Sequence, residues 1–235
     1  MATYVLIHGA WHGAWCWEQV MPLLVAAGHR VFAPDLPGHG NDTTPLFQIS
    51  LHSYVNVLCQ LLDNINEPVI LIGHSMAGIV ISQVAELRPH KIHKLIYVAA
   101  FLPQNGESMM MVASKQAPTR FVKLMRQVAY QNAFYFPLKA MKEFAYHQCS
   151  DPLMETIKPR LCVEPLLPCI TPVALTDQNY GRLSRDYIEC TEDKAILIET
   201  QRKLTNEIPC QIYTLACDHS PFYSDPHGLV HCLLA

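Results

Sequence analysis

One short turn constrains the fold more than any other feature of the chain. Residues 69–72 form an apolar, β-branched run typical of a buried parallel strand, and residues 76–87 have the apolar spacing of a helix. The segment that joins them reads Gly73-His74-Ser75-Met76-Ala77-Gly78. A strand that becomes a helix within about one residue needs small neighbours around the apex. Gly73 and Ala77 supply that room around Ser75, so the segment predicts a nucleophile elbow.

A serine on such a turn stands clear of the sheet. It lies beside the backbone N–H groups and the positive dipole end of the following helix, where negative charge is favoured. A Gly-x-Ser-x-small string also occurs by chance, but the strand before it and the helix after it are the context that the motif requires. Ala77 stands where the motif usually has its second glycine. Ser75 is therefore the candidate nucleophile.

Composition indicates a globular protein with one substantial core. The chain has 235 residues, half of them hydrophobic, which lies within the range where α/β folds stay single-domain. The net charge is −3 and there is no basic run, which argues against nucleic acid as a partner. The twelve histidines show no clustered ligand spacing, so we expect no metal and no other cofactor.

The cysteines and the N-terminus bear on cellular location. The nine cysteines include no Cys-x-x-Cys pair, and several lie in apolar patterns, so we expect reduced thiols in a cytoplasmic protein. The first apolar stretch is short and has no basic residues before it. We therefore expect neither a signal peptide nor a membrane span.

Strand and helix patterns alternate along most of the chain. Strands are expected at residues 4–7, 30–33, 69–72, 94–99, 185–190 and 211–215. Helices are expected at 18–27, 51–65 with Ser50 as the cap, 76–87, 195–204 and from Pro226 onward. This alternation predicts an α/β fold with a parallel, doubly wound sheet of about six strands.

The alternation breaks at about residue 103. Residues 103–180 are rich in proline and methionine and contain apolar patches with no clear strand. We expect a cap of short helices and proline-rich connections, inserted above a core made of residues 1–102 and 181–235. Methionine-rich surfaces adapt to irregular apolar ligands. The alternative is that these methionines only pack the cap against the core.

The first strand is followed by a doubled His-Gly-Ala-Trp at residues 8–15. Small residues after a buried strand let backbone N–H groups point into a cleft, and acyl transfer needs two such donors for the developing oxyanion. We assign them to the N–H groups of Ala10 and Met76. The alternative is a glycine-rich connection whose tryptophans pack as core. His8 and His12 are expected to order the loop by hydrogen bonding.

A histidine after the last strand is the candidate general base. An elbow nucleophile in a parallel sheet is followed in the chain by an acid and then a histidine. His219 follows the last expected strand, whereas its rivals His227 and His231 lie in the final helix. Together with Ser75, His219 predicts acyl transfer through a covalent intermediate.

Two acids follow the next-to-last strand and compete for the third catalytic position. Asp193 is better placed than Glu192 to reach over the strand ends, where ligands collect in such folds. Asp218 is adjacent to the candidate base and is expected to shape its loop. Asp35 and His39 lie in an early turn-rich loop, where we expect a structural role.

These segments resemble the α/β-hydrolase superfamily, and more narrowly the branch that holds plant methylesterases, hydroxynitrile lyases and bacterial EstC-like esterases. The resemblance is carried by the elbow and by the residues Val5–Trp15, Tyr187–Ile196 and Asp218–Phe222. It implies a six-stranded parallel sheet, a cap, and a triad at Ser75, Asp193 and His219. It also implies activity on small esters and a possible homodimer.

The departures from the lyases favour an esterase. The lyases have a threonine at the position of Gly9, an acid at that of His74 and a lysine at that of Ser220. With Trp11, these three positions are the expected substrate contacts. The resemblance thus implies a carboxylesterase for small, largely apolar esters. A hydroxynitrile lyase, a thioesterase, a perhydrolase and a small-molecule receptor without turnover are the alternatives.

Overall fold

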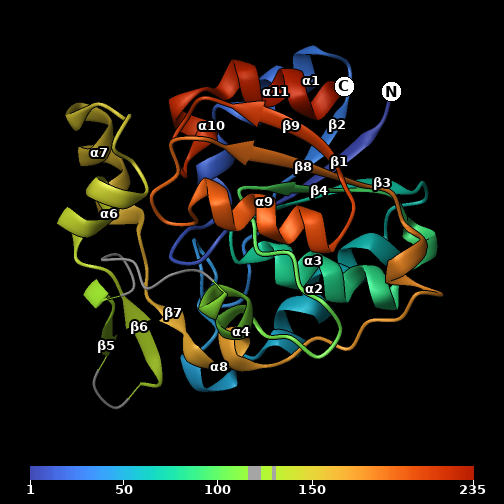
Figure 1. Ribbon diagram of the computed structural model, residues 1–235, viewed down its shortest axis with the longest axis horizontal. Helices are drawn as coiled ribbons and strands as arrows, with labels where there is room; N and C mark the ends of the chain where they lie inside the picture. Colours follow the sequence, from blue (N-terminus) through green and yellow to red (C-terminus); the bar gives the residue numbers. More distant parts are fainter. Residues whose placement is uncertain (116–122, 129–130) are drawn as a thin grey trace.

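The computed structural model describes residues 1–115, 123–128 and 131–235 (Figure 1). Its central sheet has six parallel strands in the order β2-β1-β3-β4-β8-β9, which confirms the predicted fold class. In chain order the strands are β1 (Thr3–Ile7), β2 (Arg30–Phe32), β3 (Val69–His74), β4 (Ile92–Val98), β8 (Arg185–Cys190) and β9 (Gln211–Leu215). Because all six run the same way, the loops after them gather at one edge.

Helices cover both faces of this sheet (Figure 1). Side chains alternate between the faces along each strand, so Val5 and Leu71 join one buried cluster while Leu6 and Ile72 join the other. The first cluster includes α2 (Leu51–Asp63), α3 (Ala77–Leu87) and α9 (Ile198–Glu207), and the second includes α1 (Val20–Ala26), α10 (Pro221–Ser224) and α11 (Pro226–Leu234). Short 3-10 helices lie at Ala14–Trp17, Leu46–Gln48, Pro89–Lys91, Lys158–Arg160 and Tyr180–Arg182.

Most predicted elements are present, and the differences at their ends have local causes. β8 and β9 have the expected bounds. The helix expected from residue 195 begins at Ile198, because the Asp193 carboxylate accepts the N–H groups of Ala195 and Ile196 and holds them in a turn. The helix expected at 18–27 is shorter, since Glu18 caps the preceding 3-10 helix, Gln19 is the N-cap of α1 and Ala27 is its C-cap.

Residues 103–180, called the inserted segment below, contain more structure than their sequence suggested. They carry the helices α4 (Met109–Ser114), α6 (Leu138–Phe144), α7 (Asp151–Ile157) and α8 (Leu166–Ile170), and a second sheet of β5 (Arg126–Val128), β6 (Ala133–Tyr135) and β7 (Glu164–Pro165). The expectation of no strand in this region was wrong. Strands of two or three residues are too short to show an alternating pattern, and β7 pairs with a strand far away in the chain.

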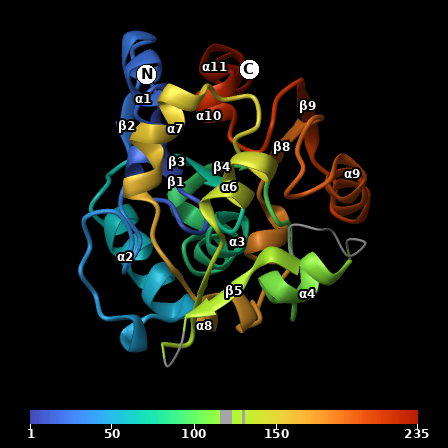
Figure 2. The ribbon, with the colours of Figure 1, turned by 90° about the vertical axis from the view of Figure 1, so that its left-hand side faces the viewer.

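Figure 2 looks onto this segment, with α6 and β5 in front of the central sheet. Residues 116–122 and 129–130 of the expected cap lie outside the described part of the chain. The division into core and cap stays a prediction. Met109, Met141 and Met154 are buried and pack in the core clusters, whereas half of Met111 is exposed. The methionines therefore serve packing at three positions at least.

None of the helices within residues 1–115, 123–128 and 131–235 combines the length and apolar character needed to cross a bilayer.

The start of α2 gives a test of the local structure. The Ser50 side chain accepts a hydrogen bond from the Ser53 N–H at 3.1 Å, and the Ser53 hydroxyl accepts one from the Ser50 N–H. Ser50→Ala removes the cap, so the free energy of unfolding should fall by about 1 kcal/mol. The melting temperature should fall by about 2–4 °C, measured by circular dichroism. His52→Ala, at an exposed position of the same turn, is the control. Equal melting temperatures for the two variants would contradict the capping role.

Candidate active site

Ser75 lies at the apex of the turn between β3 and α3. Its φ of +54° is left-handed, which is uncommon for a residue with a side chain and costs about 1–3 kcal/mol. Hydrogen bonds hold it there: its N–H donates to the Val98 carbonyl at 3.2 Å, and its carbonyl accepts the N–H of Phe101 at 3.1 Å. The serine is therefore fixed from β4 as well as from its own turn.

The small residues around Ser75 are sterically required. A Cβ atom at Gly73 would lie 2.9 Å from the Ala77 carbonyl oxygen, closer than real Cβ contacts. A Cβ atom at Gly9 would lie 2.9 Å from Ser75 Cβ and 2.8 Å from His74 Nδ1. Gly9 thus brings the loop after β1 directly against the serine, and Ala10 follows it in the chain.

The structure brings Ser75, His219 and Asp193 together. His219 Nε2 lies 3.0 Å from Ser75 Oγ, and His219 Nδ1 lies 2.7 Å from Asp193 Oδ2. Since a carboxylate only accepts, Nδ1 carries the proton and Nε2 can accept from the serine hydroxyl. All three side chains are buried. The three residues come from the loops after β3, β8 and β9, whereas His227 and His231 are exposed on α11.

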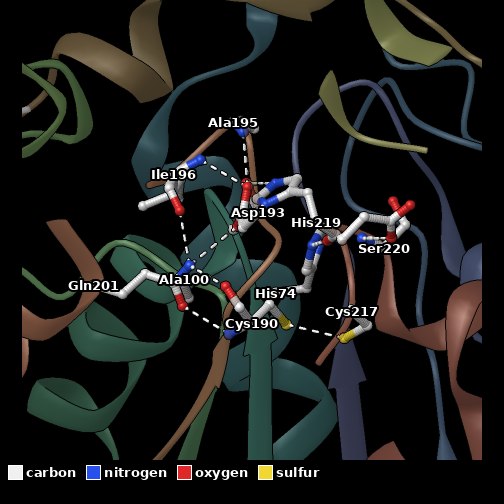
Figure 3. A network of polar contacts seen from close by, with 12 residues as sticks. His74, Ala100, Cys190, Asp193, Ala195, Ile196, Gln201, Cys217, His219 and Ser220 are labelled. Carbon is white, nitrogen blue, oxygen red and sulfur yellow. Dashed lines mark hydrogen bonds and ion pairs between the residues drawn. The ribbon is translucent and has the colours of Figure 1, made fainter. Parts of the chain in front are cut away.

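The Asp193 carboxylate is held from several sides (Figure 3). Its Oδ1 accepts the N–H groups of Ala195 at 2.7 Å and Ile196 at 2.9 Å, and its Oδ2 accepts the side-chain amide of Gln201 at 3.3 Å. The Gln201 amide also donates to the Ile196 carbonyl at 2.7 Å. The competing acid Glu192 is exposed. Asp193 is therefore oriented toward His219 before any substrate binds.

Gln201 was not recognised from the sequence. It is fully buried on α9, where its amide joins the end of β8 to the Asp193 turn. The available signal was a polar side chain on the helix face that packs against the sheet, but helix periodicity alone does not say which polar residue turns inward.

Asp218 and Asp35 have the structural places expected of them. Asp218 is buried and accepts the N–H of Ser220 at 3.0 Å and of Gln148 at 2.9 Å. It therefore shapes the loop that carries His219 and ties that loop to the inserted segment. Asp35 accepts the N–H groups of Ala14 and Asn41 from two loops.

His8 and His12 order the loop after β1, as predicted. His8 Nε2 accepts the Leu36 N–H at 3.0 Å, so its Nδ1–H donates to the Gly9 carbonyl. His12 Nδ1–H donates to the Ala10 carbonyl at 2.6 Å, and its Nε2 accepts the Tyr146 hydroxyl. Burial lowers the pKa of His12 to about 4 and that of His8 well below its usual range. Both rings are therefore neutral at pH 7.

The four expected substrate contacts lie in different surroundings. Gly9 lies against the serine, and Trp11 is half-buried with its ring edge-to-face on Phe136 at 4.8 Å. His74 and Ser220 have no exposed surface. His74 Nε2–H donates to the His219 carbonyl at 2.8 Å, so His74 supports the loop of the candidate base (Figure 3). Substrate contact by these four residues stays a prediction.

A cavity of about 280 Å³ lies beside Trp11. Apolar side chains dominate its lining, with Lys158 as the one cation among the described lining residues. The others are Trp11, Tyr135, Phe136, Pro137, Leu138, Met141, Leu161, Cys162 and Val163. The inserted segment therefore forms an apolar surface next to the loop after β1. Within the described residues, no three histidine, cysteine or acidic side chains are grouped as a metal site would need.

Comparison with known proteins places this geometry in a family. The model of the alpha/beta hydrolase family matches residues 4–231, which is nearly the whole chain. The chain belongs to the alpha/beta hydrolase family. Its elbow serine, the acid after β8 and the histidine after β9 stand in the chain order typical of that family.

The relatives of this α/β-hydrolase lie in the branch of the plant methylesterases. The chain is 31% identical to methylesterase 7 of Arabidopsis thaliana over 98% of its length and 94% of that protein. It is 34% identical to putative methylesterase 11, chloroplastic, of the same plant over 98% of its own length, but it spans only 63% of that relative. The crystal structure of polyneuridine aldehyde esterase superposes with a TM-score of 0.93, 26% identity and coverage of 100% and 98%.

The buried histidines predict acid sensitivity. The pKa of His12 is 6.5 in an unfolded chain and about 4 here, so unfolding takes up a proton between these pH values. Stability should therefore fall as pH drops from 6.5 to 4, and His8 and His74, whose pKa values burial also lowers, steepen the fall. His12→Asn should reduce the slope by about 1.4 kcal/mol per pH unit. Urea unfolding at several pH values measures it, and an unchanged slope would contradict the neutral buried His12.

Proposed function

We propose that this protein is a serine carboxylesterase that cleaves small, largely apolar esters through an acyl-enzyme on Ser75. The observation that carries the proposal is the continuous hydrogen-bonded chain from Ser75 Oγ through His219 to Asp193. Family membership supports it, since relatives over nearly the whole chain are named methylesterases. The names of these relatives favour methyl esters as the first substrates to test.

The reaction follows from the positions of the side chains. Ser75 Oγ attacks the ester carbonyl while His219 Nε2 takes its proton, and Asp193 stabilises the resulting imidazolium. The tetrahedral intermediate then expels the alcohol, which leaves with the proton from His219. Water attacks the acyl-enzyme with the same base, and the acid departs from Ser75. Every proton moves through one imidazole nitrogen, so no cofactor is required.

The N–H groups of Ala10 and Met76 are the proposed donors to the oxyanion. Met76 directly follows the serine and is the N-cap of α3, where unpaired N–H groups and the helix dipole favour negative charge. Ala10 follows Gly9, which lies against Ser75. Losing one such donor generally lowers turnover about 10²–10³-fold.

We infer that the apolar cavity beside Trp11 receives the apolar part of a small substrate. Thioester and peracid chemistry use the same acyl-enzyme, and substrate panels separate them. The cytoplasmic location, the homodimer and the absence of nucleic-acid partners stay predictions.

Removing the nucleophile tests the proposal. Ser75→Ala should fold like the wild type and lose at least about 10³-fold in ester hydrolysis, because the acyl-enzyme cannot form. The assay is release of p-nitrophenol from short-chain esters, with burst and steady-state phases recorded. Retained turnover in the variant would refute the assignment of Ser75. A wild-type burst without further turnover would instead favour the receptor alternative.

Gly9 separates the esterase from the lyase alternative. A side chain at this position has no room beside His74 and Ser75, whereas the lyases carry threonine there. The wild type should therefore cleave little or no mandelonitrile. Gly9→Ala should lower kcat for esters at least about tenfold, because the added carbon displaces the serine. Mandelonitrile turnover comparable to ester turnover would overturn the esterase reading, and full activity of Gly9→Ala would contradict the steric argument.

A further inference from the structure

Trp11 ties the loop after β1 to the inserted segment through three polar groups. Its backbone N–H donates to Glu164 Oε2 at 3.3 Å, and its carbonyl accepts the N–H of Cys162 at 3.0 Å. Its indole N–H donates to the Phe134 carbonyl at 3.3 Å. Trp11 directly follows Ala10, so these contacts act on the peptide group next to the proposed oxyanion donor.

The backbone of Trp11 depends on such contacts. Its φ is +66°, in the left-handed region that a tryptophan rarely adopts. A backbone of this kind persists only where its surroundings hold it. The direction of the Ala10–Trp11 backbone is therefore set by the inserted segment as well as by the local sequence.

Glu164 is an unusual partner because its side chain is fully buried. A buried carboxylate is costly unless charge and hydrogen bonds compensate it. Here His39, also fully buried, donates to Glu164 Oε2 at 2.9 Å, and the Tyr54 hydroxyl donates to Oε1 at 3.1 Å. His39 Nδ1 faces the Pro37 carbonyl at 3.1 Å, an acceptor only, so both ring nitrogens carry protons.

The charge state of His39 agrees with this geometry. Burial by itself lowers the pKa of His39, but the charge and hydrogen bond of Glu164, together with an interaction with Cys162, raise that pKa well above its ordinary value. The ring is therefore an imidazolium, paired with a carboxylate in the interior between the early loop and β7. His39 therefore has the structural role expected of it, and its partner is Glu164.

We propose that Glu164, neutralised by His39, is a positioning residue for ester hydrolysis: it holds the Trp11 N–H and so aims the Ala10 N–H at the oxyanion. This inference rests on the proposed esterase function. The two oxygens of the carboxylate have different tasks. Oε2 binds Trp11 in the loop after β1 and His39 in the loop after β2, whereas Oε1 binds Tyr54 on α2.

This division provides a matched set of variants. Glu164→Gln weakens the ion pair and the Trp11 contact, and Glu164→Asp keeps the charge but withdraws it from Trp11. Tyr54→Phe removes the contact to Oε1 and a longer one to His39 Nδ1, and it leaves the contact between Glu164 and Trp11 in place. Glu67→Gln makes the same charge change away from the cavity, where the carboxylate is 41% exposed and pairs with Arg30. Thermal unfolding first establishes which variants are folded.

Two readouts separate positioning from general support. The first is kcat and KM for a p-nitrophenyl ester. The second is the inhibition constant of an aryl trifluoromethyl ketone. The catalytic serine oxygen adds to the carbonyl carbon of such a ketone, and the carbonyl oxygen becomes an oxyanion. Glu164→Gln and Glu164→Asp should lower kcat about 10- to 100-fold with KM within about twofold, and should weaken the inhibitor by a similar factor. Tyr54→Phe should lower the melting temperature and keep kcat within about twofold, and Glu67→Gln should leave kcat unchanged.

The possible outcomes are distinct. Folded Glu164 variants with wild-type kcat and inhibitor affinity would overturn the inference. So would an equal loss of kcat in Tyr54→Phe, or a loss of kcat with unchanged inhibitor affinity, because a merely structural role gives those results. If Glu164→Gln does not fold, Glu164→Asp decides. Wild-type turnover that Ser75→Ala abolishes upholds the proposed function whatever the Glu164 variants do, and absence of wild-type turnover refutes both proposals.

Discussion

The left-handed backbone of Ser75 is the constraint on which the rest of the site depends. A non-glycine residue at φ +54° is stable only if its surroundings compensate the strain. The hydrogen bond that Ser75 donates to the Val98 carbonyl and the one that it accepts from the Phe101 N–H do so, and Gly73 and Gly9 leave the space that the turn needs. The position of the serine therefore depends on β4 and on the loop after β1 as well as on its own turn. The residues 73–78 specify the turn, and the assembled sheet holds the serine in its left-handed conformation.

Two buried carboxylates then organise the groups around the serine. Asp193 is satisfied by two backbone N–H groups, the Gln201 amide and His219, so its orientation toward the candidate base is determined in advance. Glu164 is satisfied by an imidazolium, a tyrosine hydroxyl and the Trp11 N–H. Each carboxylate joins segments far apart in the chain, and fixed dipoles of this kind favour catalysis because they need not reorganise during reaction.

The predictability of the elements follows their length and periodicity. The core strands could be predicted because each carries aliphatic or aromatic residues and because they alternate along the chain with segments of helical spacing. The strands β5, β6 and β7 could not, because each has two or three residues and is stable only through its partners. α9 begins later than predicted for another reason: the Asp193 carboxylate accepts the N–H groups of Ala195 and Ile196, which the predicted helix included.

The sequence by itself determined the parallel α/β fold, the elbow at Ser75 and the chain order of serine, acid and histidine. These are local properties, since apolar periodicity and small residues around a turn act within a few positions of the chain. Only the tertiary structure decided which polar groups support them: Gln201 behind Asp193, and Glu164 with His39 beside Trp11. The reason is physical. A polar side chain can be buried only with a partner, and these partners are brought together from loops and strands whose separation in the chain carries no pattern.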